Sequence, residues 1–290
     1  MNHQQNSKGS QSSWNLRGAD AETRKNNQVN AGALWRITAN DIVYEDEVLI
    51  AINKPAGIPS QATLDPNRDN CYAAVQRYLE RKSDHAYVGL HHRLDAMTSG
   101  VLLMTKSKDV NVSVSEQFQQ HVIRKKYCAI CVTKPGNDWD VRLDQDWFDG
   151  KKSFVLDAPI GEIPDVKNQK FCVGGKKRKP AQTEFFCETC LCFDTERLVV
   201  CQCMPLTGRT HQIRVHLSSL GLGIVGDVVY GFGLPRYLRS MDPRRMCLHA
   251  ESLRFVHPVS GEEMTICAPR PVEFQTFVKK AGKLKASGAK

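Results

Sequence analysis

Residues 91–100 read HHRLDAMTSG and place a single carboxylate, Asp95, between two apolar runs. Residues 87–90 (YVGL) precede this stretch, and residues 101–104 (VLLM) follow it with the pattern of a buried strand. A charged loop residue between core elements often belongs to a functional site, because rigid scaffolds carry their reactive side chains on loops. An aspartate in a loop also commonly caps a turn. From this stretch alone, both roles of Asp95 stay open.

The charge of the chain favours a polyanionic partner. Its 290 residues include 40 Lys and Arg against 31 Asp and Glu, a formal net charge of +9. Nucleic acid is the first candidate for a basic protein, although such an excess also serves solubility alone. The hydrophobic fraction of 41% is sufficient for a globular core. No apolar run reaches the roughly 18 residues of a membrane helix, so we expect no membrane partner.

The N-terminal segment and the cysteines bear on the compartment. Residues 1–13 (MNHQQNSKGSQSS) lack the apolar segment of a secretory signal. Arg17 and Arg24 would suit an organelle-targeting peptide, but the acidic Asp20 and Glu22 argue against one. Eleven cysteines, an odd number, indicate a reducing compartment and free thiols. We therefore expect a cytoplasmic protein.

Five of the cysteines lie between positions 187 and 203, with the spacing C-x2-C-x-C-x8-C-x-C. This spacing differs from that of a pair of zinc knuckles. The surrounding residues, 183–186 and 198–204, read instead as two β-strands joined by a turn. Cysteines in such strands pack as small apolar side chains, so we expect no metal.

The order of predicted elements indicates the fold class. Strands and helices follow one another without regular βαβ alternation, which favours an α+β fold on a mixed, largely antiparallel sheet flanked by helices. We expect strands at 42–44, 48–52, 126–132, 183–186 and 198–204, and a hairpin of 247–256 with 264–268. We expect helices at 71–82 and 108–124, one ending at Gly221, and one opened by Pro271. Residues 135–180 show no clear pattern.

Composition divides the chain into three parts. Residues 1–33 are rich in Gln, Asn, Ser and Lys and bury too little apolar surface to offset their ordering entropy, so a disordered tail is expected. One folded domain is expected over 34–281, followed by a short basic tail over 282–290. We expect a monomer, because no apolar interface stripe is visible.

Several motifs follow one another in the order found in one enzyme family. They are VLIAINKPAGI (48–58), HRLDAMTSG (92–100), KKYCA (125–129), GRTHQIRVH (208–216), GDVVYG (226–231) and LHA (248–250). Each motif is weak alone, but their joint order over residues 40–275 resembles the RluA family of RNA pseudouridine synthases. The resemblance implies a pseudouridine synthase catalytic domain that isomerises uridines in structured rRNA or tRNA, with neither cofactor nor metal.

The resemblance also implies three catalytic residues. Asp95 is the carboxylate that attacks the anomeric carbon of the ribose or assists loss of its C2′ proton. Arg209 matches the arginine that pairs with this aspartate, where a guanidinium keeps a carboxylate ionised, and a phosphate contact is its alternative role. Tyr127 matches a tyrosine that stacks on the target uracil or acts as a base, although a tyrosine in a strand usually belongs to the core.

Four further residues are expected to contact the RNA. A stacked uridine must leave its helix to reach an active site, and Arg93 matches the position associated with holding that gap. His92 is interpreted as an RNA contact or a hydrogen-bond partner within the loop. Ile213 is expected in the apolar floor under the base. Arg214 is expected at the RNA backbone or as structural support.

Two departures and two alternative functions stay open. Ala96 and Met97 stand where many relatives carry a charged residue after the aspartate, and no S4-type RNA-binding domain is expected before the fold. RNA capture would then depend on the basic face of the domain. One alternative is an RNA-binding assembly factor or chaperone with secondary or lost catalysis. The other is a zinc-dependent base-modifying enzyme such as a deaminase, which would require metal at the cysteines.

Overall fold

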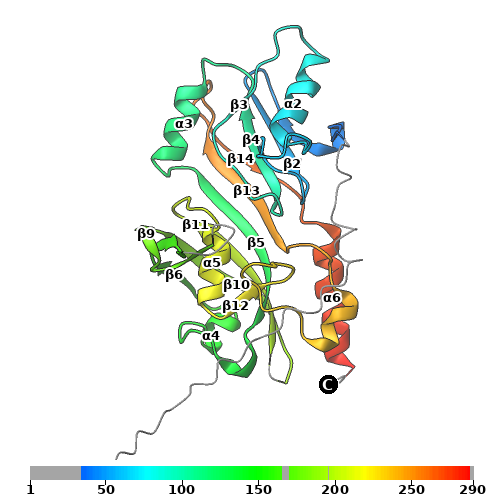
Figure 1. Cartoon of the computed structure of the whole chain (residues 1–290), viewed down its shortest axis with the longest axis vertical. Coiled ribbons are helices and arrows are strands. Elements are labelled where there is room, and N and C mark those ends of the chain that lie inside the picture. Colours follow the sequence, from blue (N-terminus) through cyan, green and yellow to red (C-terminus); the bar gives the residue numbers. More distant parts are fainter. Residues whose placement is uncertain (1–33, 165–169, 195, 288–290) are drawn as a thin grey trace, which may run out of the picture.

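The computed structural model describes residues 34–164, 170–194 and 196–287. The expected disordered tail, residues 1–33, lies outside the described residues. One long sheet runs through the molecule (Figure 1). Its main path is β1 (Ile42–Glu45), β2 (Leu49–Lys54), β4 (Ser99–Thr105), β13 (Leu248–Val256), β5 (Arg124–Thr133), β11 (Arg197–Pro205), β10 (Gln182–Cys192) and β6 (Ser153–Asp157).

Three shorter strands join this path from the side. They are β3 (Gly89–Leu90) beside β4, β12 (Leu222–Ile224) beside β5, and β14 (Glu263–Cys267) beside β13. Every pairing in the sheet is antiparallel except that of β4 with β13. The predicted α+β fold on a mixed, largely antiparallel sheet is therefore confirmed.

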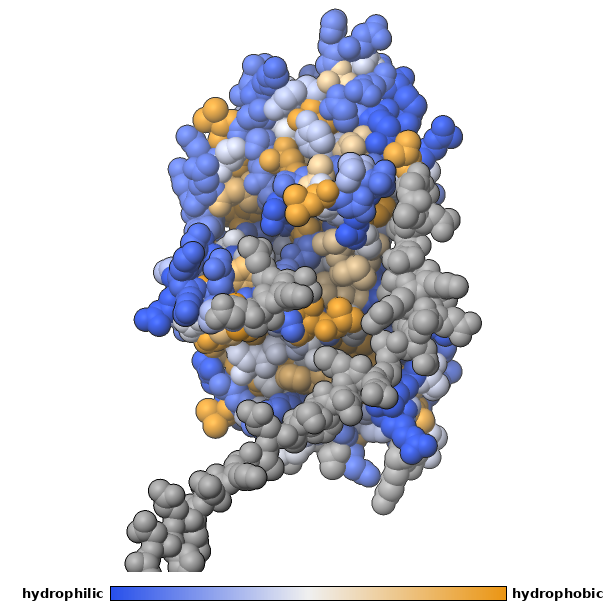
Figure 2. Space-filling view, in the orientation of Figure 1, coloured by the Kyte–Doolittle hydropathy of each residue, from blue (hydrophilic) through white to orange (hydrophobic). Residues whose placement is uncertain are grey.

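A small second sheet forms from the region that showed no sequence pattern. It contains β7 (Ile160–Glu162), β8 (Phe171–Val173) and β9 (Lys176–Lys179), in the order β8-β7-β9. Strands of three or four residues are too short to display a periodicity, and α4 (Gln145–Phe148) is equally short. All four residues of β9 are cationic and exposed, and Figure 2 shows hydrophilic side chains gathered where this strand lies.

Longer helices cover the sheet: α2 (Cys71–Glu80), α3 (Asn111–Gln119), α5 (Gln212–Ser219) and α6 (Val272–Ala286). Short 3-10 turns are η1 (Ala39–Asp41), η2 (Pro135–Asn137) and η3 (Arg236–Met241). Helix α3 ends before the predicted residue 124, because the chain turns at His121 (φ 58°) to start β5. Helix α6 continues past residue 281, where we expected the basic tail to begin. No helix in the described part of the chain combines the length and apolar character needed to cross a bilayer.

The hydrophobic core is divided by the sheet. The largest cluster surrounds β5, β10 and β11 and includes Phe274 and Phe277 of α6. A second cluster lies between α2 and strands β2 and β4. Tyr127 in β5 packs against both clusters and therefore stands at their junction. This junction is where the motif residues meet.

Candidate active site

The loop that carries Asp95 is held by the last residue of β2 and by the segment that follows it. The ammonium group of Lys54 donates hydrogen bonds to the carbonyl oxygens of Pro55 and Ala96, both at 2.9 Å. The backbone N–H of Gly57 donates to the same Ala96 oxygen at 2.8 Å. Lys54 is fully buried, and this burial lowers its pKa to about 8. The NKPAG motif therefore supports the reactive loop.

The other end of the loop is fixed by the parallel pairing of β4 with β13. Gly100 lies opposite Ala250 and adopts φ 114°. A Cβ at Gly100 would lie 2.1 Å from the Ala250 carbonyl oxygen, so only glycine fits this position. Beside it, the Ser99 hydroxyl and His249 Nδ1 are 2.8 Å apart. The TSG and LHA motifs are thus two sides of one contact.

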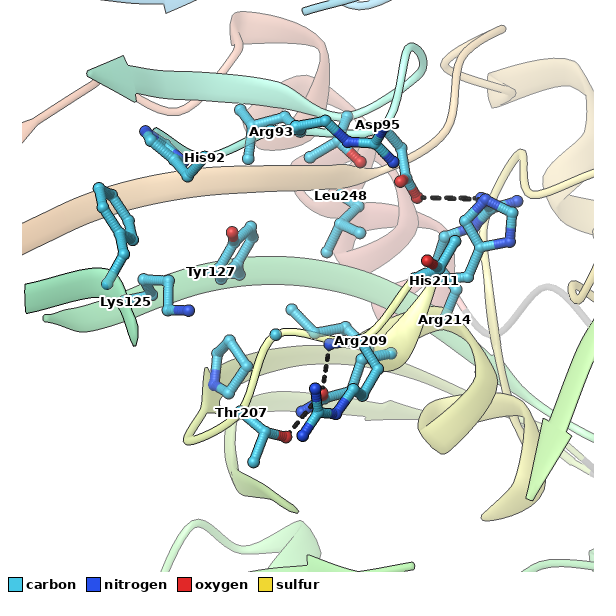
Figure 3. A pocket seen from close by; sticks show the side chains of 18 of the residues that line it. His92, Arg93, Asp95, Lys125, Tyr127, Thr207, Arg209, His211, Arg214 and Leu248 are labelled. Atoms are coloured by element: carbon cyan, nitrogen blue, oxygen red, sulfur yellow. Dashed lines mark hydrogen bonds and ion pairs between the residues drawn. The ribbon is translucent and has the colours of Figure 1, made fainter. Parts of the chain in front are cut away.

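Arg214, from the first turn of α5, joins two carboxylates. Its Nη1 donates to Asp95 Oδ2 at 3.0 Å (Figure 3). Its Nε and Nη2 donate to the two oxygens of Asp227 at 2.7 and 2.9 Å. The Asp227 side chain is 1% exposed and that of Arg214 is 8% exposed, whereas that of Asp95 is 29% exposed. The guanidinium is therefore anchored on one side and presents its remaining edge to the accessible carboxylate.

The GDVVYG segment builds the anchor for Arg214. Asp227 Oδ1 accepts the backbone N–H groups of Val229 and Tyr230 at 2.9 and 3.1 Å. Burial tends to raise the pKa of Asp227, but the hydrogen bonds and charge of Arg214 outweigh it and lower the pKa. The guanidinium carbon of Arg214 lies 5.0 Å from the centre of the Tyr230 ring, which adds a cation–π contact.

His211 lies next to the ion pair at the start of α5. It adopts a left-handed conformation (φ 57°), and its Nδ1 is 3.0 Å from the Tyr230 hydroxyl. Its Nε2 is 3.9 Å from Asp95 Oδ2. Burial lowers the pKa of His211, so the imidazole is neutral at neutral pH. Arg214 is then the cation that contacts Asp95.

The prediction that Arg209 pairs with Asp95 is wrong. Its Nε donates to the carbonyl oxygen of Pro180 at 2.8 Å, and its backbone N–H donates to Gln212 Oε1 at 2.9 Å. Among the described residues it contacts no carboxylate. Both arginines belong to the GRTHQIRVH motif, but the reversal at His211 separates the turn from the helix and directs Arg214 towards Asp95. Arg214, which we expected at the RNA backbone or as structural support, is the arginine that forms the ion pair with Asp95.

These groups line a cavity of about 330 Å³. Tyr127 points into it from β5, beside Leu248 (Figure 3). Ile213 adds to the apolar part of the lining. In the part of the chain that is described, the Tyr127 hydroxyl has no hydrogen-bond partner. Burial raises the pKa of this phenol, and the charge of Asp95 raises it further. Tyr127 is therefore protonated at neutral pH and its hydroxyl is free to meet a ligand.

The predicted RNA contacts occupy different positions around this cavity. Arg93 is exposed next to Asp95 and has no carboxylate partner among the described residues. His92 lines the cavity, but its Nε2 accepts the Leu103 backbone N–H at 2.9 Å and its ring stacks on Phe118. Burial lowers the pKa of His92 to about 3, so this ring is neutral. His92 thus supports the loop from within.

Sequence reasoning missed the positioning residues Asp227 and Gln212. The buried Gln212 amide connects the Thr207 hydroxyl, at 2.8 Å, to Thr183 Oγ1, at 2.9 Å, and so braces the turn before α5. Asp227 was visible as the acidic residue of the GDVVYG motif. Its partner was not identified, because nothing in a linear motif indicates which cation lies opposite.

Three of the five clustered cysteines belong to the core. Cys187, Cys201 and Cys203 are buried, and Cys190 and Cys192 lie at the end of β10. Within the described residues, no three His, Cys, Asp or Glu side chains converge as metal ligands would. The zinc-dependent alternative therefore has no geometric support in these strands.

Fold and site together place one aspartate, held by a buried arginine, at a cavity with apolar and polar lining. The family model for RNA pseudouridylate synthase matches residues 48–219. The chain belongs to this family and is an RNA pseudouridine synthase, an isomerase, as the sequence resemblance predicted.

Relatives and solved structures extend the match over most of the chain. RNA pseudouridine synthase 1 of Arabidopsis thaliana is 33% identical, covering 87% of this chain and 82% of its own length. The dual-specificity RNA pseudouridine synthase RluA of Escherichia coli O157:H7 is 33% identical, covering 79% and 92%. The human RNA pseudouridylate synthase domain containing 4 has a similar fold, with a TM-score of 0.62, 23% identity and coverage of 83% and 92%.

Proposed function

We propose that Asp95 carries the isomerisation of a uridine that is flipped out of a structured RNA into the 330 Å³ cavity. The observation that carries this proposal is the ion pair of Asp95 with Arg214, which Asp227 holds in place. The guanidinium, 3.0 Å from the carboxylate, fixes the orientation of Asp95 and places a positive charge beside it. Asp95 is thereby kept ready to react.

The reaction needs no external reagent. Asp95 attacks C1′ as the C1′–N1 bond breaks, and the uracil leaves as an anion that turns within the cavity. C5 then displaces the carboxylate and forms the C1′–C5 bond, and the C5 proton passes to solvent while N1 takes up a proton. In the alternative route, Asp95 removes the C2′ proton as the C1′–N1 bond breaks, which leaves a glycal and a uracil anion. C5 then adds to C1′ as the proton returns from Asp95 to C2′, and the C5 proton passes to solvent while N1 takes up a proton. Both routes begin with an ionised Asp95 beside the ribose.

Tyr127 stacks on the uracil and donates its hydroxyl proton in a hydrogen bond. The raised pKa of its phenol argues against a base, because a base must be deprotonated before it can accept a proton. Ile213 and Leu248 cover the remaining apolar surface of the base. His92 positions the loop rather than contacting RNA, since its Nε2 already accepts a backbone hydrogen bond.

Arg93 and Arg209 hold the RNA around the extruded uridine. Arg93 fills or holds the gap that the flipped base leaves, and Arg209 contacts a phosphate at the rim. Exposed guanidinium groups without carboxylate partners suit such contacts, because phosphate binding then costs no existing ion pair. The RNA is rRNA or tRNA; a related ribosomal large subunit pseudouridine synthase D from Zymomonas mobilis supports the first.

The enzyme acts as a monomer in the cytoplasm. The eleven cysteines are all free thiols, as a reducing compartment requires. Size-exclusion chromatography with light scattering tests the first statement, and fractionation of cells that express a tagged chain tests the second. A stable dimer or a membrane-enclosed location would contradict them.

Tritium release from C5-labelled uridine tests the role of Asp95. The substrate is total RNA labelled in cells that lack this gene, so the modified position need not be known beforehand. Asp95→Asn keeps the shape of the side chain but removes its charge, and we expect release to stop while RNA binding stays within about twofold of wild type. Turnover by Asp95→Asn near the wild-type rate would refute the proposal.

A further inference from the structure

A second cavity, of about 250 Å³, lies beside the active-site cavity. Both cavities are lined by His121, Lys125 and Pro205. Two groups bound in the two cavities would therefore be separated by a single layer of side chains. The floor of the second cavity is apolar and is formed by Ile123, Met204, Pro205 and Leu206. We call it the flanking pocket.

The flanking pocket arises because the main sheet divides. Strands β5 and β11 pair as far as Tyr127 with Cys203 and then separate. Beyond that point β5 continues to pair with β13 as far as Arg124, and β11 continues to pair with β10 as far as Pro205. The pocket occupies the gap between the diverging strands. Because ladder pairing fixes both walls, the pocket is a preformed feature of the fold.

Its walls are rich in cations. Arg124 is exposed and, among the described residues, has no hydrogen-bond or ion-pair partner. Lys125 is half-buried between the two cavities, likewise without a polar partner there, and burial lowers its pKa. The cation Arg254 is already paired with Glu263. The acidic residue of the lining, Glu184, accepts a hydrogen bond from the Ser153 hydroxyl at 2.7 Å.

We propose that the flanking pocket binds the base of the nucleotide next to the target uridine. This inference rests on the proposed function. Extruding one base unstacks its neighbour, whose exposed face then gains by contact with an apolar surface. The phosphate that joins the two nucleotides lies over the shared wall, where Lys125 is available. An apolar floor with unpaired cations at its margin matches a nucleotide: a flat base attached to an anionic backbone.

Fluorescence of 2-aminopurine in a short single-stranded RNA tests this assignment. The RNA carries one uridine among cytidines, with the probe directly 5′, directly 3′ or several positions away. All proteins carry Asp95→Asn, so binding is measured without turnover and independently of the tritium-release experiment. Met204→Trp fills the pocket, and Arg124→Gln removes an unpaired cation. Arg236→Gln is the matched control, since Arg236 is exposed and lines neither cavity.

We expect one adjacent probe to change its fluorescence on binding, and Met204→Trp to abolish that change and weaken binding about tenfold. Arg124→Gln should weaken binding several-fold, and Arg236→Gln should not. Thermal unfolding near that of the parent protein establishes that each variant is folded. Equal responses from adjacent and distant probes, or an adjacent response that survives both Met204→Trp and Arg124→Gln, would overturn the assignment.

Discussion

The active-site cavity has two arginines from one motif, and they differ in their partners. Arg214 is buried and donates to two carboxylates, whereas Arg209 lies at the rim and donates its Nε only to a backbone carbonyl oxygen. Arg214 orients the carboxylate of Asp95, but its hydrogen bonds are already made to two carboxylates and so it attracts a phosphate only weakly. A cation at the rim without a carboxylate partner attracts phosphates but does not contact Asp95. On the proposed function, one wall of the cavity therefore serves chemistry and the other serves RNA capture.

The largest effect should appear when each of the two arginines is replaced separately by lysine. In Arg214→Lys the compact ammonium cannot reach Asp95 and Asp227 together, so we expect kcat to fall about 100- to 1000-fold. Arg209→Lys keeps a cation at the rim and should leave kcat within about twofold. Single-turnover tritium release measures both. If kcat fell more in Arg209→Lys than in Arg214→Lys, the roles assigned to the two arginines would have to be exchanged.

Lys54 extends the comparison of the two arginines to a buried cation that donates its hydrogen bonds to carbonyl oxygens and not to carboxylates. Its pKa of about 8 lies below the ordinary lysine value of 10.5, so between these pH values the unfolded chain binds a proton that the native protein does not. The free energy of unfolding should therefore rise with pH across this window, by up to about 3 kcal/mol from Lys54.

Urea unfolding of wild type and Lys54→Met between pH 8 and 10.5 isolates this contribution, because other titrating groups cancel in the difference. The exposed Lys279→Met controls for the loss of one positive charge. Parallel pH profiles for wild type and Lys54→Met would mean that Lys54 titrates alike in both states of the chain.

The smallest effect should be that of removing the rim cation. We expect Arg209→Gln to raise KM about tenfold without changing kcat, as loss of one charged hydrogen bond to a phosphate would. The slope of the logarithm of the RNA-binding constant against the logarithm of salt concentration should become shallower by about one. Filter binding at several salt concentrations, on a transcript whose uridine has been mapped, gives the slope. An unchanged slope together with a reduced kcat would place Arg209 on the chemical wall.

Local sequence predicted most of the elements that surround the site. The strand after Gly100 was clear because every residue of β4 is buried, and the strand pair that carries Cys187 and Cys203 was clear from its apolar patterning. The region 135–180 was not readable, because β7, β8 and β9 contain only three or four residues each, too few to show a periodicity. The flanking pocket was equally hidden, since it results from two strand ladders that separate.

The sequence by itself determined the family, the reactive loop and Asp95 as its candidate carboxylate, because these depend on residue types at fixed local spacing. It also contained both arginines and Asp227. Only the tertiary structure decided which arginine meets Asp95. That choice depends on the left-handed turn at His211 and on the backbone amides that fix Asp227, and these bring together segments more than a hundred positions apart in the chain. Charge pairing is a property of distance in space, and a linear motif does not contain it.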